Sequence, residues 1–260
     1  MSEPTTTVLV LLALAALLAG FVDAVVGGGG LIQLPALLLG LPHAAPVEVL
    51  ATNKLASFCG TTVSSATYYR RVRPDPRTFG PLMLAAFIGS ACGAAVASRI
   101  PAEAFDPIVL AALLIVGAYV VRSPSLGGVT TLRFAGRRHT AAALVAGLVI
   151  GAYDGMLGPG TGSFLVFALV GVLGYSFLEG SAKARLANWA TNLAALAVFV
   201  PQGAVLWHVG LVMGAANLVG GYLGARTAVA RGSRFVRVLF LVVVGAFVVR
   251  IGGELVGLWG

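Results

Sequence analysis

The stretch Asp23-Ala-Val-Val-Gly-Gly-Gly-Gly30 decides the fold, because a version of it returns 131 residues later as Asp154-Gly-Met-Leu-Gly-Pro-Gly-Thr161. The same offset, with no gap, carries Ala51 and Lys54-Leu-Ala56 onto Ala182 and Arg185-Leu-Ala187. Glycine has no Cβ and adopts backbone conformations that other residues avoid, so each glycine run favours a sharp turn. The repeat therefore predicts two related halves, each with a turn at its glycines.

The composition indicates that the chain lies in a lipid bilayer. Hydrophobic residues make up 58% and charged residues 10% of the 260, whereas soluble domains have roughly 25% charged residues. The segments 31–41 and 162–175 are apolar but too short to cross a bilayer, since a span needs about 20 residues. Because each follows a glycine turn, we expect it to pair with the preceding apolar segment as a re-entrant hairpin. The other apolar segments are 6–22, 45–69, 78–98, 104–121, 140–157, 182–200, 203–225 and 235–257.

Arginines cluster in three connections between apolar segments, at 70–77, 122–138 and 226–237. Such loops are cytoplasmic under the positive-inside rule, so the net charge of +8 does not indicate a nucleic-acid partner. With the first two loops cytoplasmic, the loop at 98–104 is expected outside, whereas its counterpart at 229–235 belongs to a cytoplasmic loop. The two halves then have opposite orientations, and both termini are extracytoplasmic.

These patterns predict an all-α polytopic membrane protein of the cell membrane with two inverted-topology repeats. Each repeat has a glycine-interrupted re-entrant helix pair plus about three transmembrane helices. The first repeat covers 1–121, a basic cytoplasmic linker covers 122–139, and the second repeat covers 140–260.

The glycine turns are candidate anion sites. A half-helix is expected to begin at Leu31, and another after Gly162. Helix starts present unpaired amides and a positive dipole end, and glycine lets a ligand approach them closely. The alternative is that the glycines only allow a sharp turn or close helix packing. The candidate residues of the two turns are Gly27, Gly28, Gly29, Gly30, Gly158, Gly160, Thr161 and Gly162.

Polar side chains recur on one face of the segment after each turn, and polar groups at membrane depth usually face a cavity or a partner. The lysines could instead extend to the membrane surface, and the asparagines could only join helices. Either Lys183 or Arg185 could correspond to Lys54, because Lys183 lies two residues from the repeat position. The candidate residues are Asn53, Lys54, Ser57 and Thr61 in the first half and Lys183, Arg185, Asn188 and Asn192 in the second.

Asp23 and Asp154 have two open interpretations. They could carry protons during a transport cycle, or pair with Lys54 and Arg185 and stay ionised. The glycine pairs at 89 and 93 and at 220 and 224 have the spacing of close helix contacts. The three histidines lack metal-ligand spacing and there is no nucleotide-binding motif, so we expect no enzyme activity, metal or cofactor.

The residues quoted above resemble the sulfite exporter TauE/SafE family. The resemblance covers essentially the whole chain and rests on the Asp23–Gly30 turn, on Ala51-Thr-Asn-Lys-Leu-Ala56, and on the second turn followed by Ala182-Lys183 and Asn192. It implies a small two-repeat membrane protein that moves anions, chiefly sulfur oxyanions and organosulfonates such as sulfite and sulfoacetate. Pro159 stands opposite Gly28 and Thr161 opposite Gly30, so the two half-sites are not strictly equivalent.

Together, these features predict a secondary transporter that exports a small anion by alternating access, with coupling to H+ or another ion left open. Its partners are the anion and the lipid bilayer, and the oligomeric state is also open. A passive anion channel is the nearest alternative. A non-transporting membrane subunit or a membrane enzyme is the alternative from another class.

Overall fold

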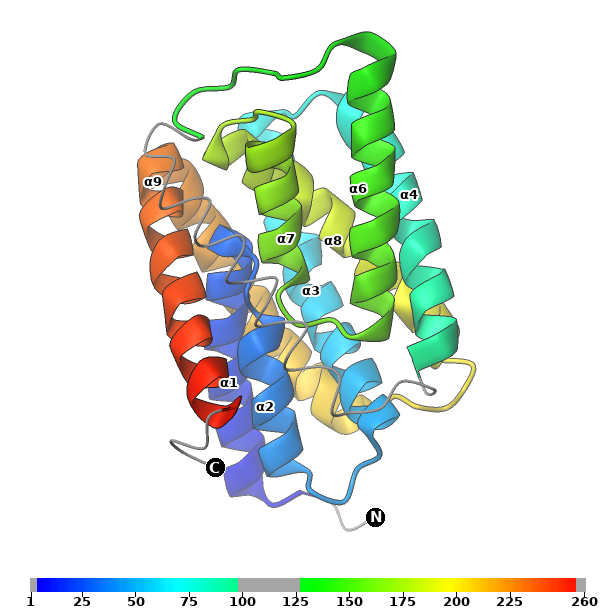
Figure 1. Ribbon diagram of the computed structural model, residues 1–260. Helices are drawn as coiled ribbons and strands as arrows, with labels where there is room; N and C mark the ends of the chain where they lie inside the picture. Colours follow the sequence, from blue (N-terminus) through cyan, green and yellow to red (C-terminus); the bar gives the residue numbers. More distant parts are fainter. Residues whose placement is uncertain (1–3, 98–126, 256–260) are drawn as a thin grey trace.

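The computed structural model describes residues 4–97 and 127–255, and the regular secondary structure in these ranges is helical (Figure 1). The expected loop at 98–104, the apolar segment 104–121 and Arg122 lie outside the described residues. α9 has two segments, because Gly232 breaks it with φ 71°. The helices are α1 (Thr6–Val26), α2 (Gly30–Gly40), α3 (Pro46–Val72), α4 (Pro76–Val96), α6 (Gly136–Met156), α7 (Thr161–Phe167), the π-helix η3 (Ala168–Val172), α8 (Phe177–Phe199) and α9 (Trp207–Leu255).

Local sequence accounts for several helix ends. The Thr5 hydroxyl caps α1 by accepting a hydrogen bond from the Val8 amide at 3.4 Å, and α1 ends at Gly27, whose φ of 91° favours glycine. α4 begins with Pro76 in its first turn, and the Asp75 carboxylate accepts a hydrogen bond from the Arg77 amide at 3.0 Å. These caps fix where the chain reverses between neighbouring helices.

Both glycine turns reverse the chain inside the bundle. α1 starts at the end of the bundle where α9 finishes, and α2 returns to that end, whereas α6 starts at the opposite end and α7 returns there (Figure 1). The helices after the turns begin at Gly30 and Thr161, slightly earlier than the expected starts at Leu31 and after Gly162. The two hairpins therefore approach the middle of the bundle from opposite ends.

The two halves of the chain interlock. α3 and α8 occupy the middle of the bundle, α1 packs against α9, and α4 packs against α6 (Figure 1). A Cβ added at Gly93 would lie 2.1 Å from the Ala152 carbonyl oxygen, and one at Gly224 would lie 2.4 Å from the Phe21 carbonyl oxygen. The offset of 131 relates these two contacts with the halves exchanged. Close helix packing at these glycines is confirmed, and Gly89 and Gly220 make the same kind of contact.

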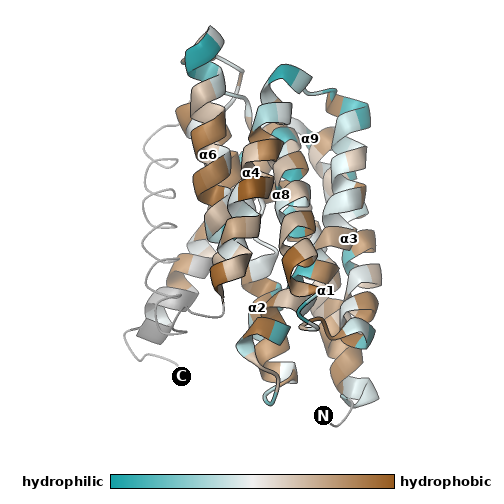
Figure 2. Cartoon of the chain, turned by 90° about the vertical axis from the view of Figure 1, so that its right-hand side faces the viewer, coloured by the Kyte–Doolittle hydropathy of each residue, from teal (hydrophilic) through white to brown (hydrophobic). Residues whose placement is uncertain are grey.

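The outer surface of the bundle is apolar along its length. Large hydrophobic side chains are exposed on α1, α4, α6 and α9, whereas hydrophilic residues gather where α3 ends and α4 begins and at the start of α6 (Figure 2). Within the described part of the chain, α1 and α4 are long and apolar enough to cross a membrane. Such a surface suits lipid rather than water. The arginine-rich stretches at 70–77, 133–138 and 226–237 lie together at one end of the bundle (Figure 1). The third was expected to be a loop, but it belongs to α9 and is helical except at the break at Gly232.

Candidate anion-binding site

The tips of the two hairpins touch in the middle of the bundle. The Ser163 amide, in the first turn of α7, donates a hydrogen bond to the Gly27 carbonyl at 3.0 Å. A Cβ on Gly27 would lie 2.0 Å from the carbonyl carbon of Gly162. Gly27 and Gly158, related by the repeat offset, have φ values of 91° and 89°. Glycine is therefore required at the first tip both for the turn and for the contact between hairpins.

Two buried ion pairs cross between the halves beside this contact. Lys54 Nζ lies 2.6 Å from Asp154 Oδ2, and both side chains are 2% exposed. Arg185 Nη1 lies 2.7 Å from Asp23 Oδ2, with side-chain exposures of 0% and 14%. The repeat offset carries Lys54 onto Arg185 and Asp23 onto Asp154, so each pair maps onto the other with the halves exchanged. Lys54 thus points inward rather than to the membrane surface.

A small polar cavity of about 20 Å³ lies beside the pairs; Lys54 and both carboxylates line it, whereas Arg185 does not. The cavity has room for about one water-sized molecule. The structure brings most of the candidate residues named from the sequence into its lining. The lining residues are Asp23, Gly27, Gly30, Asn53, Lys54, Ser57, Asp154, Gly158, Thr161, Gly162, Asn188 and Asn192.

Several other candidate residues support this cavity without lining it. The Gly29 amide donates a hydrogen bond to Asp23 Oδ1 at 3.3 Å, so Gly29 packs on α1 and a Cβ there would meet the Asp23 Cβ at 2.6 Å. Gly160 begins α7 with φ 78°, and the Gly28 carbonyl accepts a hydrogen bond from the first turn of α2. The Thr61 hydroxyl lies 3.5 Å from Asn192 Nδ2. These residues set the shape of the turns and the orientation of the lining amides.

Lys183 lies apart from the cavity, near the arginine-rich end. Its Nζ donates to the Asp75 carbonyl oxygen at 3.4 Å and lies 4.7 Å from the centre of the Tyr175 ring. Burial raises the pKa of the Tyr175 phenol, which stays neutral beside the lysine. Arg185, two residues along α8, points instead to the hairpins. Its position and its carboxylate partner match those of Lys54 in the first half.

The buried Arg185 guanidinium has N–H donors that the described residues leave without an acceptor. Its Nε and Nη2 have no hydrogen-bond partner among residues 4–97 and 127–255, and a Cβ on Gly162 would lie only 2.4 Å from Nη2. Lys54 Nζ similarly lies 3.5 Å from where a Gly158 Cβ would stand. Buried guanidinium donors normally have acceptors, and oxyanions supply several at once. Chemically, the arrangement suits a small oxyanion held between two cations and two glycine turns.

Comparison with known protein families matches residues 12–251 to the family described as "Sulfite exporter TauE/SafE". The chain belongs to this family. "Probable membrane transporter protein ORF9" of a Sinorhizobium species is 35% identical over 94% of this chain and 92% of its own length. "Probable membrane transporter protein" of Haemophilus influenzae is 34% identical over 86% of each chain. "Probable membrane transporter protein YfcA" of Escherichia coli K12 is 34% identical over 88% of this chain and 83% of its own length. No solved structure matches this chain.

In this TauE/SafE member, polar groups that were not among the candidate residues hold the first hairpin. The last carbonyls of a helix lack intrahelical partners, and three side chains satisfy those of α1. Tyr68 donates to the Ala24 carbonyl at 3.0 Å, and Ser163 donates to the Val26 carbonyl at 3.1 Å. Ser181 donates to the Val25 carbonyl at 3.4 Å. The first hairpin tip is therefore tied to α3, α7 and α8.

A second interior contact of the TauE/SafE member was also not predicted. Asn217 Nδ2 on α9 donates to Gln33 Oε1 on α2 at 2.8 Å, and both residues are buried. Their position in apolar segments was a usable signal, because an amide at membrane depth needs a partner. The contact links α2 of the first half to α9 of the second.

Proposed function

We propose that the chain is a secondary transporter that exports small anions, sulfur oxyanions or organosulfonates such as sulfite or sulfoacetate, across the cell membrane by alternating access. The observation that carries the proposal is the crossed arrangement of Lys54–Asp154 and Arg185–Asp23 beside one small polar cavity, which Lys54 and both carboxylates line. Family membership supplies the transporter class, and the family's description names sulfite. The residues themselves support an oxyanion at this place.

In the proposed site, Lys54 and Arg185 supply positive charge and the asparagines of the lining donate hydrogen bonds, while Thr61, which donates to the Ser57 carbonyl and lies 3.5 Å from Asn192 Nδ2, orients that asparagine. Asp23 and Asp154 hold the two cations while no substrate is bound. An arriving anion then takes the place of a carboxylate, using the free Nε and Nη2 donors of Arg185. Exchange of one anionic partner for another avoids leaving an unpaired charge in a buried site, which would be costly.

The proposed transport cycle uses the two hairpins as opposed gates of inverted repeats. The cavity of about 20 Å³ is smaller than an oxyanion needs, so substrate enters only when one hairpin moves away from the other. That movement breaks the hydrogen bond from the Ser163 amide to the Gly27 carbonyl. We place the arginine-rich end in the cytoplasm and both termini outside, as the positive-inside rule requires. Binding between repeats near the midplane is common in secondary transporters.

Flux into proteoliposomes tests the proposal. Vesicles preloaded with unlabelled sulfite should accumulate radiolabelled sulfite against its own gradient, with saturable rates. Thiosulfate, sulfate, sulfoacetate and small carboxylates added as competitors define the substrate class. A passive channel would equilibrate label without this counterflow, and a subunit or enzyme would move none. Either outcome would overturn the proposal.

A further inference from the structure

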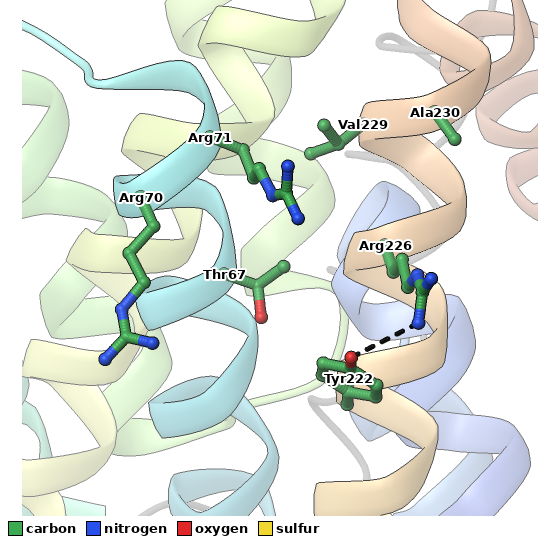
Figure 3. Close-up of a pocket in the computed structure, with 7 residues that line it drawn as sticks. All are labelled: Thr67, Arg70, Arg71, Tyr222, Arg226, Val229 and Ala230. Atoms are coloured by element: carbon green, nitrogen blue, oxygen red, sulfur yellow. Dashed lines mark hydrogen bonds between the residues drawn. The ribbon is translucent and has the colours of Figure 1, made fainter.

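A second anionic site is available at the arginine-rich end, far along the bundle from the hairpin tips. A groove of about 460 Å³ lies between the last turns of α3 and the stretch of α9 that precedes its break at Gly232. Figure 3 shows Arg71 extending into the space between the two helices, and Arg226 running along α9 onto Tyr222. The groove is lined by Thr67, Arg70, Arg71, Tyr222, Arg226, Val229 and Ala230.

The charges of this groove are uncompensated within the described protein. Arg70, Arg71 and Arg226 are exposed, and no carboxylate of residues 4–97 and 127–255 lies within 4.0 Å of their guanidinium groups. Arg226 Nη1 donates to the Tyr222 hydroxyl at 3.4 Å, which leaves the phenolic proton free to donate in turn. Two helices thus present guanidinium and hydroxyl donors to one space, a pattern that suits a phosphate group.

The surface next to the groove is apolar rather than aqueous. Leu218, Val219 and Leu223, on α9 below Arg226, are 41%, 46% and 46% exposed. They continue from the groove along the face of the bundle that meets lipid. A free phosphate ion gains nothing from such a surface, whereas the acyl chains of a phospholipid bury it.

We propose that this groove binds an anionic phospholipid, with the headgroup phosphate between Arg71 and Arg226 and the acyl chains along α9. Basic pockets between transmembrane helices at the cytoplasmic surface are suited to such headgroups. The lipid joins α3, which carries Lys54, to α9 of the other half. It therefore stabilises the packing of the two halves against each other from a site separate from the transported anion.

Thermal unfolding in dodecylmaltoside micelles tests this site without any transport measurement. Purified protein is titrated with dioleoylphosphatidylglycerol, with dioleoylphosphatidylcholine and with inorganic phosphate. The test variant is Arg71→Gln with Arg226→Gln. The matched control is Arg77→Gln with Arg234→Gln, which removes the same charge from the same end of the bundle but leaves the groove intact.

Phosphatidylglycerol should stabilise the wild type and the control at lipid concentrations at least about tenfold lower than the test variant needs, because two charge-assisted hydrogen bonds are lost. Phosphatidylcholine and inorganic phosphate should have a much smaller effect on all three proteins. An equal lipid response in the test variant, or an equal loss in the control, would overturn the assignment. Stabilisation by inorganic phosphate as strong as that by the lipid would show a free-anion site and overturn it as well.

Discussion

Asp154→Asn removes the negative charge that faces Lys54 while keeping almost the same side-chain volume. Because Lys54 Nζ and Asp154 Oδ2 are 2.6 Å apart and both side chains are 2% exposed, the variant has a buried ammonium without a charged partner. Loss of one partner from a buried pair costs about 3–5 kcal/mol. We therefore expect Asp154→Asn to unfold at a markedly lower temperature than the wild type when no anion is present.

Added anion should reverse much of this loss, since it can replace the missing carboxylate beside Lys54. A hydrogen bond to a charged group contributes about 1.5–3 kcal/mol, which corresponds to roughly ten- to a hundredfold in affinity. Asp154→Asn should bind sulfite more tightly than the wild type by about this factor, because no carboxylate competes for the lysine. Its transport should be slower, since releasing the anion again leaves Lys54 unpaired.

Thermal unfolding over a series of sulfite concentrations measures both effects, because binding stabilises by RT ln(1 + [L]/Kd). Asp75→Asn is the control, as Asp75 is exposed at the arginine-rich end and forms no ion pair in the described structure. The double variant Lys54→Met with Asp154→Asn should recover stability but lose the anion response. An unchanged sulfite affinity in folded Asp154→Asn would refute competition between carboxylate and anion.

Three further predictions concern the lysine, the turns and the topology. Lys54→Ala should lower anion affinity about ten- to a hundredfold in thermal-shift titrations, while Lys54→Arg should retain binding with slower flux because guanidinium is larger and planar. An anion affinity in Lys54→Ala equal to that of the wild type would show that the lysine has only a structural role. Gly158 and Gly203 have positive φ values of 89° and 69°, a conformation that alanine avoids. Gly158→Ala and Gly203→Ala should therefore each lower the free energy of unfolding by about 1–2 kcal/mol. Only Gly158→Ala should weaken the anion response, since its Cβ position lies 3.5 Å from Lys54 Nζ, whereas that of Gly203 has no atom of the described residues within 4 Å. Equal anion responses of the two variants would count against the turn as a binding element. Val129→Cys should react with an impermeant maleimide only from the cytoplasm and Gln202→Cys only from outside, and labelling from the same side would contradict the proposed orientation.

The sequence repeat marked the charged residues in the centre of the molecule but did not settle how they pair. An offset of 131 relates Lys54 to Arg185 and Asp23 to Asp154, and pairing between carboxylates and these cations was one of the two interpretations it left open. The structure contains that pairing, across the halves rather than within them. A linear pattern cannot say which half supplies the partner, because that depends on how the two hairpins pack.

The side chains that sequence reasoning misplaced or missed depend on direction in three dimensions. Lys183 and Arg185 are two residues apart on α8, so they point to nearly opposite faces of the helix, and only Arg185 reaches the hairpins. Ser163 and Asn217 act through contacts with segments more than a hundred residues away. No local periodicity reports such partners. Sequence could only have marked these residues as polar groups in apolar segments.

Counterflow of sulfite in proteoliposomes, compared among three methionine variants on the two central helices, tests the central claim most directly. Lys54, Lys183 and Arg185 are all at most 1% exposed, but only Lys54 and Arg185 are paired with the hairpin carboxylates. We predict that Lys54→Met and Arg185→Met abolish counterflow in folded protein, while Lys183→Met retains it. Counterflow that survives in Lys54→Met and Arg185→Met, or that is lost equally in Lys183→Met, would contradict an anion site formed by the crossed pairs.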